Sequence, residues 1–225
     1  WFALSGEPVF DAHGTFVGYR GIGRDVTARK QAEATIERLA YYDGLTGLCN
    51  RRSFQDRVVQ AQASSARSGQ WAALCFIDLD NFKDINDAFG HAAGDGLLRE
   101  MAQRLRESVR AKDTVGRLGG DEFVVLLEDL REDEEQAAWR AQHVAEKLRQ
   151  VLERPAVIDG HDLQATPSIG ITLFRGQTDT VEDILGRADL AMYHSKAAGR
   201  NAVRFFDPAM QARVVQRATL QRELR

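Results

Sequence analysis

Two adjacent carboxylates follow a double glycine in the stretch RLGGDEF, which runs from Arg117 to Phe123. Glycine adopts backbone conformations that other residues avoid, so a glycine pair lets a backbone approach a bulky ligand closely. Taken alone, the stretch predicts a hairpin turn that carries exposed acids. A third carboxylate, Asp78, ends a separate apolar run. If the two predicted strands are neighbours, Asp78, Asp121 and Glu122 share one rim.

Three carboxylates on one rim repel one another unless a cation lies between them. Oxygen ligands of this kind suit Mg²⁺ or Mn²⁺, and magnesium held by few carboxylates completes its coordination with substrate phosphates. The cluster therefore favours metal-assisted phosphate chemistry. The alternative is that Asp78 caps the helix or turn that follows DLDNF, a common role for aspartate. The spacing in the sequence leaves both interpretations open.

Other phosphate-binding and calcium-binding motifs are absent from the sequence. The glycines of GIG, at positions 21 and 23, are followed by Val26 where a dinucleotide fingerprint needs glycine, and the chain has no Walker glycine-lysine loop. DLDNFK fails as an EF-hand loop because Phe82 and Lys83 stand where an oxygen ligand and a glycine are needed. A phosphate site in this chain must be of another design.

The elements that position these residues alternate between strand and helix. Buried strands are predicted at ALCFIDLD, ending at Asp78, and at DEFVVLLE, PSIGITLF and AVRFF. Helices are predicted at GDGLLREMAQRLRESV, QAAWRAQHVAEKLRQVLERP and VEDILGRADLAMYHSKAAGR. This order, with a hairpin inserted, predicts an α+β fold with a ferredoxin-like βαββαβ core.

The two ends of the chain have patterns of their own. Residues 1–25 fit short strands and turns and are too few to form a core. From Val26 onward, apolar residues near helical spacing predict a helix that joins two units, either a solvated linker or one strand of a coiled coil. The tail after Phe206 also has a helical pattern. Because the chain begins at Trp1 without a methionine or a signal peptide, we expect a piece of a longer protein.

The composition fits a folded protein and excludes several classes. The 225 residues are 44% hydrophobic and 28% charged, with a formal charge of -3, so no global field favours nucleic acid or an anionic membrane. The apolar run WAALCFI is far shorter than the roughly 20 residues that cross a bilayer. Cys49 and Cys75 have neither zinc nor disulfide spacing. We expect a cytoplasmic location, with an upstream membrane anchor left open.

Several separated motifs resemble one family, the GGDEF domains, which are diguanylate cyclases that condense two GTP molecules into cyclic di-GMP. The matching motifs are the opening segment DGLTGLCNRRSF, the metal and guanine segment FIDLDNFKDINDAFGHAAGD, the hairpin RLGGDEF and the closing helix ADLAMYHSKAAGRN. The resemblance covers roughly Tyr42 to Phe206. It implies a nucleotidyl-cyclase or palm-like fold over residues 42–207, in which helices flank a central mixed, mostly antiparallel sheet.

The resemblance also implies a role for each matching residue. The metal, Mg²⁺ or Mn²⁺, would be held by the side chains of Asp78, Asp121 and Glu122 and by the backbone carbonyl of Leu79. Glu122 would either join this metal site or help to deprotonate the attacking 3′-hydroxyl. Backbone amides or positive charge would bind phosphates at Phe82, Lys83, Lys196 and Arg200. Gly119 and Gly120 would let the hairpin backbone lie against the nucleotide.

Two further sites follow from the same resemblance. Asn86 and Asp95 would read guanine, whose edge an amide and a carboxylate complement; the alternative is helix capping, because GD precedes a helix predicted from Gly96. Arg110 and Asp113 match the family's R-x-x-D site, at which cyclic di-GMP inhibits synthesis. Judged alone, Arg110 would be an ordinary arginine in the last turn of a helix.

The flanks resemble partial modules of signalling proteins. Residues 1–25 resemble the end of a PAS sensory domain, residues 26–41 its exit helix, and residues 208–225 a helical linker toward an EAL phosphodiesterase domain. The family's chemistry needs two GTP-bound domains face to face, so a homodimer is expected. The alternative function is a regulatory module that binds GTP or cyclic di-GMP and controls a downstream EAL domain. The unbroken signature favours the cyclase, whereas the tail favours the regulator.

Overall fold

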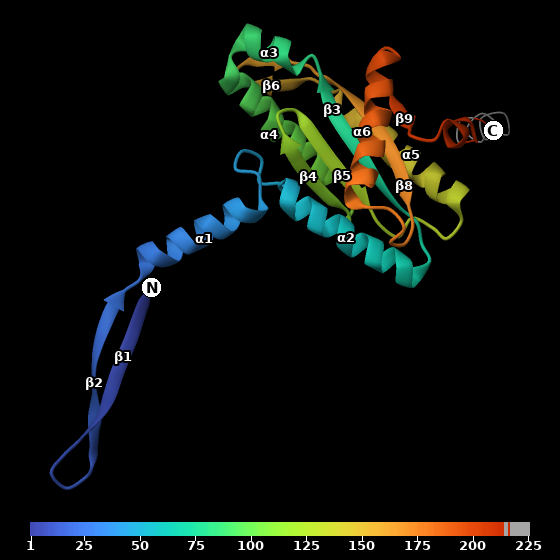
Figure 1. Cartoon of the computed structure of the whole chain (residues 1–225). Helices are drawn as coiled ribbons and strands as arrows, with labels where there is room; N and C mark the ends of the chain where they lie inside the picture. Colours follow the sequence, from blue (N-terminus) through green and yellow to red (C-terminus); the bar gives the residue numbers. More distant parts are fainter. Residues whose placement is uncertain (214–215, 217–225) are drawn as a thin grey trace. The chain divides into compact units, whose positions relative to one another are not determined.

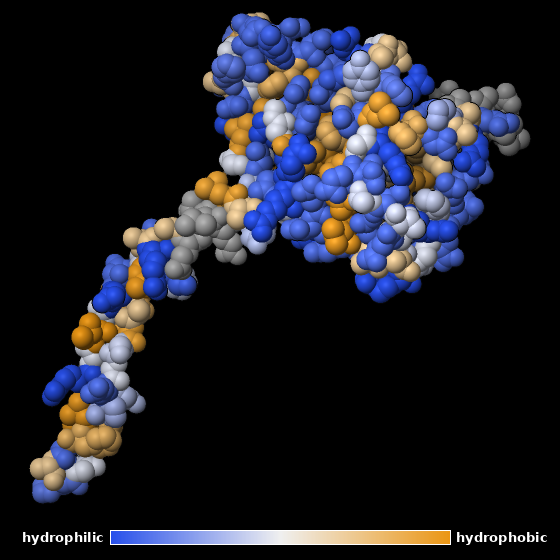
Figure 2. All heavy atoms as spheres, in the orientation of Figure 1, coloured by the Kyte–Doolittle hydropathy of each residue, from blue (hydrophilic) through white to orange (hydrophobic). Residues whose placement is uncertain are grey.

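The structure is a computed structural model that describes residues 1–213 and 216, without the side chains of residues 33–38. It divides into two units at the boundary between Tyr41 and Tyr42. The first unit contains an antiparallel pair of strands, β1 (Phe2–Phe10) and β2 (Phe16–Asp25), followed by helix α1 (Thr27–Tyr41). Both strands expose large apolar side chains, visible as orange spheres along the hairpin in Figure 2. The predicted strands and joining helix are thus present in this unit.

The second unit is built around a five-stranded sheet in the order β4-β5-β3-β8-β9 (Figure 1). Its strands are β3 (Ala72–Asp80), β4 (Thr114–Gly119), β5 (Glu122–Leu127), β8 (Thr166–Phe174) and β9 (Val203–Phe205). All neighbours are antiparallel except β8 and β9, which are parallel. A separate small hairpin joins β6 (Ala156–Ile158) to β7 (His161–Leu163). This topology confirms the predicted βαββαβ core, with β9 added at one edge.

Helices cover both faces of this sheet (Figure 1). Helices α4 (His91–Ser108) and α5 (Glu134–Leu152) pack on one face, and α2 (Arg51–Ser68) and α6 (Val181–Ala197) pack on the other. Alternate residues of β3 enter the two cores, with Cys75 and Ile77 in the first and Leu74 and Phe76 in the second. Asp78 continues the second set, so its side chain emerges on the α6 face.

Several element boundaries differ from the predictions. β3 continues to Asp80 instead of ending at Asp78, because pairing with β8 extends to its last residue. α4 begins at His91, directly after Gly90, and thus starts three residues before the predicted helical stretch at Gly94 and five before Gly96. The short helix α3 (Phe82–Phe89) lies where the sequence left a helix or a turn open, since eight residues carry little periodicity. The predicted tail helix is seen at residues 208–213, and most of its remainder lies outside the described residues.

None of the described helices is both long and apolar enough to cross a bilayer.

Candidate active site

The double glycine forms the turn between β4 and β5, and the pairing register shifts between Arg117 and Gly119. Gly119 has φ 147° and Gly120 has φ 52°, conformations that glycine adopts without strain. A Cβ atom at either position would meet no other heavy atom within 4 Å. The glycines are therefore required by the shape of the turn, and the face of the turn is open. This agrees with the predicted hairpin.

Arg117 ties this turn to the segment before α2. Its Nε and Nη2 donate to the carbonyl oxygen of Gly120 at 2.9 and 2.7 Å, and its Nη1 lies 2.9 Å from Asp43 Oδ1. Burial opposes ionisation of Asp43, but hydrogen bonds from Thr46 and Arg117 outweigh it, so the pKa of Asp43 lies below its ordinary value. Sequence reasoning assigned no role to Asp43 or Arg117, because the two are joined only by the fold.

Asp78 faces Glu122 across the pairing of β3 with β5. Asp78 is buried, and Lys196 Nζ, from the last turn of α6, lies 2.6 Å from its Oδ1. Burial raises the pKa of Asp78 to about 6; Lys196 lowers it, and Asp121 and Asp80 raise it. Despite the close lysine, Asp78 Oδ1 accepts no hydrogen bond of good geometry within the described part of the chain. A buried carboxylate oxygen in this state is suited to a cation.

The other two acids lie beside Asp78 at the start of β5. Asp121 occupies the turn, and Glu122 is the first residue of the strand. Burial raises the pKa of Glu122, Arg51 lowers it from 3.9 Å away, and Asp189 and Asp121 raise it. Sequence reasoning missed Arg51 and Asp189 as neighbours of Glu122. In the conformation described, no group of three His, Cys, Asp or Glu side chains among residues 1–213 and 216 is arranged to hold a metal ion.

The register also fixes the direction of the Leu79 carbonyl. In β8, the N–H of Ile169 and the carbonyl oxygen of Ile171 hydrogen-bond to the segment that contains β9. The β3 residues paired with them, Ile77 and Cys75, therefore point their backbone N–H and C=O groups toward β5. Leu79 has the same orientation two residues after Ile77, and the pairing with β5 ends at Asp78. Its carbonyl therefore faces the hairpin beyond the last pair. This carbonyl and the Asp78 carboxylate are oxygen donors of the chemical type that Mg²⁺ and Mn²⁺ prefer.

The predicted phosphate-binding residues surround the same end of the sheet. The ring of Phe82 is buried in the core, so only its backbone can face a ligand, and the first N–H groups of α3 have no helical partner. Lys83 and Arg200 are exposed, and neither side chain forms an ion pair with any described residue. Arg200 has φ 62° in the loop after α6.

Asp80, which sequence reasoning passed over, holds this loop in place. Its carboxylate is buried and accepts hydrogen bonds from Thr166 and Ser168 of β8, each at 2.8 Å, and from the backbone N–H of Asn201 at 3.1 Å. The loop that carries Arg200 is thereby anchored to the end of β3. The sequence DLD could have indicated this role, because Asp78 and Asp80 are alternate residues of one strand and therefore share a face.

Asn86 and Asp95 lie on neighbouring helices, α3 and α4, and both are half-buried. Capping is wrong for Asp95, because α4 begins at His91 and Asp95 lies inside it. Capping is wrong for Asp78 as well, since Asn81 is the N-cap of α3 and Asp78 is paired with Lys196. Asn86 occupies the second half of α3, away from its N-terminus.

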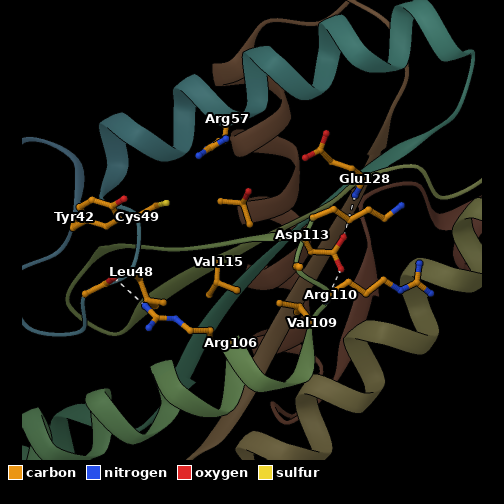
Figure 3. Close-up of a pocket in the computed structure, with 14 residues that line it drawn as sticks. Tyr42, Leu48, Cys49, Arg57, Arg106, Val109, Arg110, Asp113, Val115 and Glu128 are labelled. Atoms are coloured by element: carbon orange, nitrogen blue, oxygen red, sulfur yellow. Dashed lines mark hydrogen bonds between the residues drawn. The ribbon is translucent and has the colours of Figure 1, made fainter. Parts of the chain in front are cut away.

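Arg110 and Asp113 lie at the bend between α4 and β4, on the wall of an open cavity of about 450 Å³ (Figure 3). The N–H of Arg110 donates to Asp113 Oδ2 at 3.0 Å. α4 ends at Ser108, so Arg110 is not in a last helical turn, and that alternative is wrong. The same cavity is lined by Arg57 and Arg106, which add positive charge.

Fold and site together define an α+β domain with acidic side chains, basic side chains and a glycine turn at one end of its sheet. The family described as "Diguanylate cyclase, GGDEF domain" matches residues 40–202, and the chain belongs to this family. The chain is 42% identical over 199 residues to "Bifunctional diguanylate cyclase/cyclic di-GMP phosphodiesterase MucR" of Pseudomonas aeruginosa, covering 88% of this chain and 28% of MucR. It is 41% identical to "Response regulator PleD" of Caulobacter vibrioides over 78% of this chain and 38% of PleD.

Solved structures show the same fold. The GGDEF domain of TpbB (YfiN) from Pseudomonas aeruginosa superposes with a TM-score of 0.69 at 37% identity, covering 78% of this chain and 99% of that domain. The GGDEF domain of DgcB from Caulobacter crescentus, in complex with c-di-GMP, gives a TM-score of 0.68 at 30% identity, covering 75% of this chain and 94% of that one. The predicted palm-like GGDEF fold is confirmed.

Proposed function

We propose that this chain carries a diguanylate cyclase module, which converts two GTP into cyclic di-GMP and two pyrophosphates. Each 3′-hydroxyl would attack the α-phosphate of the other GTP across a homodimer. The observation that carries the proposal is the pairing of buried Asp78 with Glu122 beside an open glycine turn. Relatives described as diguanylate cyclases, among them TpbB, support it.

The proposed metal site consists of Asp78, Asp121 and Glu122 with the Leu79 carbonyl. A bound Mg²⁺ or Mn²⁺ would neutralise the charge that develops on the α-phosphate and the departing pyrophosphate. Glu122, with its raised pKa, either completes this set or accepts the proton of the attacking 3′-hydroxyl. Both roles place its carboxylate beside the reacting atoms.

The chain's own residues bind and orient GTP. We assign the triphosphate to Lys83, Lys196, Arg200 and the backbone amides at the start of α3. The side chains of Asn86 and Asp95 make no hydrogen bond to any described residue, so both are available to a guanine base. Gly119 and Gly120 leave the hairpin surface free for the nucleotide.

Arg110 and Asp113 form the proposed inhibitory site for cyclic di-GMP. The arginine offers bidentate donors to a phosphate or a guanine edge. The cavity beside them is lined by three arginines and a lysine against two acids, Asp113 and Glu128, and this excess of positive charge suits an anionic dinucleotide (Figure 3). The complex of the DgcB GGDEF domain with c-di-GMP supports a product site on this fold.

Neighbouring domains belong to the proposal, since the chain covers only 28% of MucR and 38% of PleD. The exposed apolar side chains of β1 and β2 fit a hairpin that belongs to a larger sensory domain, which we assign to PAS. We assign residues 26–41 to the linker helix, residues 42–207 to the GGDEF domain, and residues 208–225 to a linker that leads toward an EAL domain. The bifunctional MucR supports this last assignment.

The second candidate is a regulatory module, favoured by 39% identity over 194 residues to "Cyclic di-GMP phosphodiesterase NbdA" of Pseudomonas aeruginosa. One experiment separates the two. The purified chain, fused to a dimeric coiled coil, is incubated with GTP and Mg²⁺, and cyclic di-GMP is measured by chromatography. The cyclase proposal expects product. Binding of GTP without formation of cyclic di-GMP would support the regulatory module instead.

A further inference from the structure

The proposed guanine readers, Asn86 and Asp95, meet where α3 packs on α4 next to Gly94. Gly94 is buried one residue before Asp95. An added Cβ at Gly94 would overlap Asn86 Oδ1, and it would lie 3.0 Å from Asn86 Cγ and 3.2 Å from Phe82 Cζ. Real Cβ atoms do not approach other atoms so closely, so the Asn86 amide occupies space that only glycine leaves open.

Packing, not hydrogen bonding, orients this amide. Within the described residues, the side chain of Asn86 accepts and donates no hydrogen bond, although it is half-buried. The backbone around it is tied down, because Gly90 N–H donates to Asn86 O at 2.9 Å and Gly94 N–H donates to Gly90 O at 3.3 Å. The contact with Gly94 therefore sets where the Asn86 amide lies.

Moving the amide would disturb base recognition more than phosphate binding. An added Cβ at Gly94 would meet the tip of Asn86 and the ring tip of Phe82 first, and none of the atoms nearest to it belongs to Lys83, Lys196 or Arg200. A hydrogen bond weakens steeply when its geometry departs from linearity, so a small displacement of an amide has a large effect on affinity. We infer that Gly94 is a positioning residue for guanine selection, acting through Asn86. This inference rests on the proposed function.

The test is a double-mutant cycle between Gly94→Ala and Asn86→Ala. The probe is a GTP analogue with a methylene bridge between the α- and β-phosphates, bound with Mg²⁺ and measured by calorimetry. We expect Gly94→Ala to weaken binding at least tenfold, and to change the affinity for the matching ATP analogue less than twofold. In the Asn86→Ala background, where the space is vacated, Gly94→Ala should add less than a twofold change.

Gly186→Ala is the matched control, because Gly186 also lies inside a helix and a Cβ there meets no atom within 4 Å. It should leave binding unchanged. Unchanged binding in Gly94→Ala, or an equal loss in the Asn86→Ala background, overturns the inference. If Gly94→Ala does not fold by circular dichroism, restored folding in the double variant supports the contact with Asn86, and an unfolded double variant refutes it. A wild-type chain that fails to prefer the GTP analogue refutes the proposed function itself.

Discussion

Lys196 Nζ lies 2.6 Å from Asp78 Oδ1 and joins the last turn of α6 to the buried end of β3. The two residues are more than a hundred positions apart in the sequence, so the sheet topology alone brings the closing helix to the acid. A single buried carboxylate with a raised pKa is unfavourable for folding. Its presence at the open end of the sheet is typical of a site where function outweighs stability.

Replacing Asp78 should therefore separate activity from stability. We expect Asp78→Asn to reduce cyclic di-GMP synthesis at least 100-fold in the coiled-coil dimer, because an amide is a poor ligand for Mg²⁺. Its melting temperature should be unchanged or higher, because an amide is cheaper to bury than a carboxylate. Asp56→Asn, on the exposed side of α2, is the control and should change neither quantity. Retained synthesis in Asp78→Asn would show that the proposed metal site is wrong.

The link between Asp43 and Arg117 should appear as pH-dependent stability. The pKa of Asp43 is lowered in the folded state, so its contribution is present above the unfolded pKa of about 3.9 and is lost as the pH falls through the folded value. Hydrogen bonds to charged groups contribute about 2 kcal/mol. Asp43→Asn should lower the free energy of unfolding in urea by about that amount at pH 7.5, and by clearly less at pH 3.5. An equal loss at both pH values would contradict an ionic role.

A third prediction concerns the contact between α6 and β8. A Cβ at Gly170 would overlap Ala188 O and Met192 N and lie 2.8 Å from Ala191 C, all backbone atoms of α6. A backbone cannot move aside as a side chain does, so Gly170→Ala should destabilise the domain by about 3 kcal/mol or more. Denaturant unfolding measures this. Gly176→Ala is a control for strain without crowding, because Gly176 has φ 73° and a Cβ there would meet no atom within 4 Å. If Gly170→Ala lowers the free energy of unfolding no more than Gly176→Ala does, α6 can shift to make room for the methyl group.

Periodic and paired elements were predictable from the sequence, and contacts between distant segments were not. The strand at Asp78 and the hairpin at Gly119 follow from local apolar runs and turn residues. The start of α4 was misplaced because Gly90, with φ 83°, begins the helix without a side-chain cap. The hydrogen bonds of Asp80 and the ion pair between Arg117 and Asp43 join residues at least 70 positions apart in the sequence, so no local pattern encodes them.

Some of the alternatives left open by the sequence depended on where a helix begins or ends. Asp95 would have been a cap if α4 had begun at Gly96, and Arg110 would have been an ordinary helix-end arginine if α4 had extended past Ser108. Helix ends are the least certain part of any pattern, because terminal residues make few periodic contacts. The fold decided both questions by placing Asp95 inside α4 and Arg110 beyond its end.

The bend between α4 and β4 allows product feedback to be tested apart from catalysis. Arg110 is exposed on the cavity wall, and its backbone is held by Asp113, so Arg110→Ala removes the guanidinium while leaving the bend formed. Cyclic di-GMP affinity by calorimetry should fall at least tenfold, since a charged bidentate donor is lost. The initial rate of synthesis should be unchanged, and progress curves should no longer slow as product accumulates.

Arg99→Ala, which removes an exposed arginine from α4 itself, is the control for a general loss of positive charge. It should bind cyclic di-GMP as the unmodified chain does, because Arg99 is not among the residues that line the cavity. Equal weakening in both variants would mean that the product is attracted by net charge alone. Unchanged affinity in Arg110→Ala would show that the Arg110 guanidinium does not bind the product, and the proposed inhibitory site at this bend would be wrong.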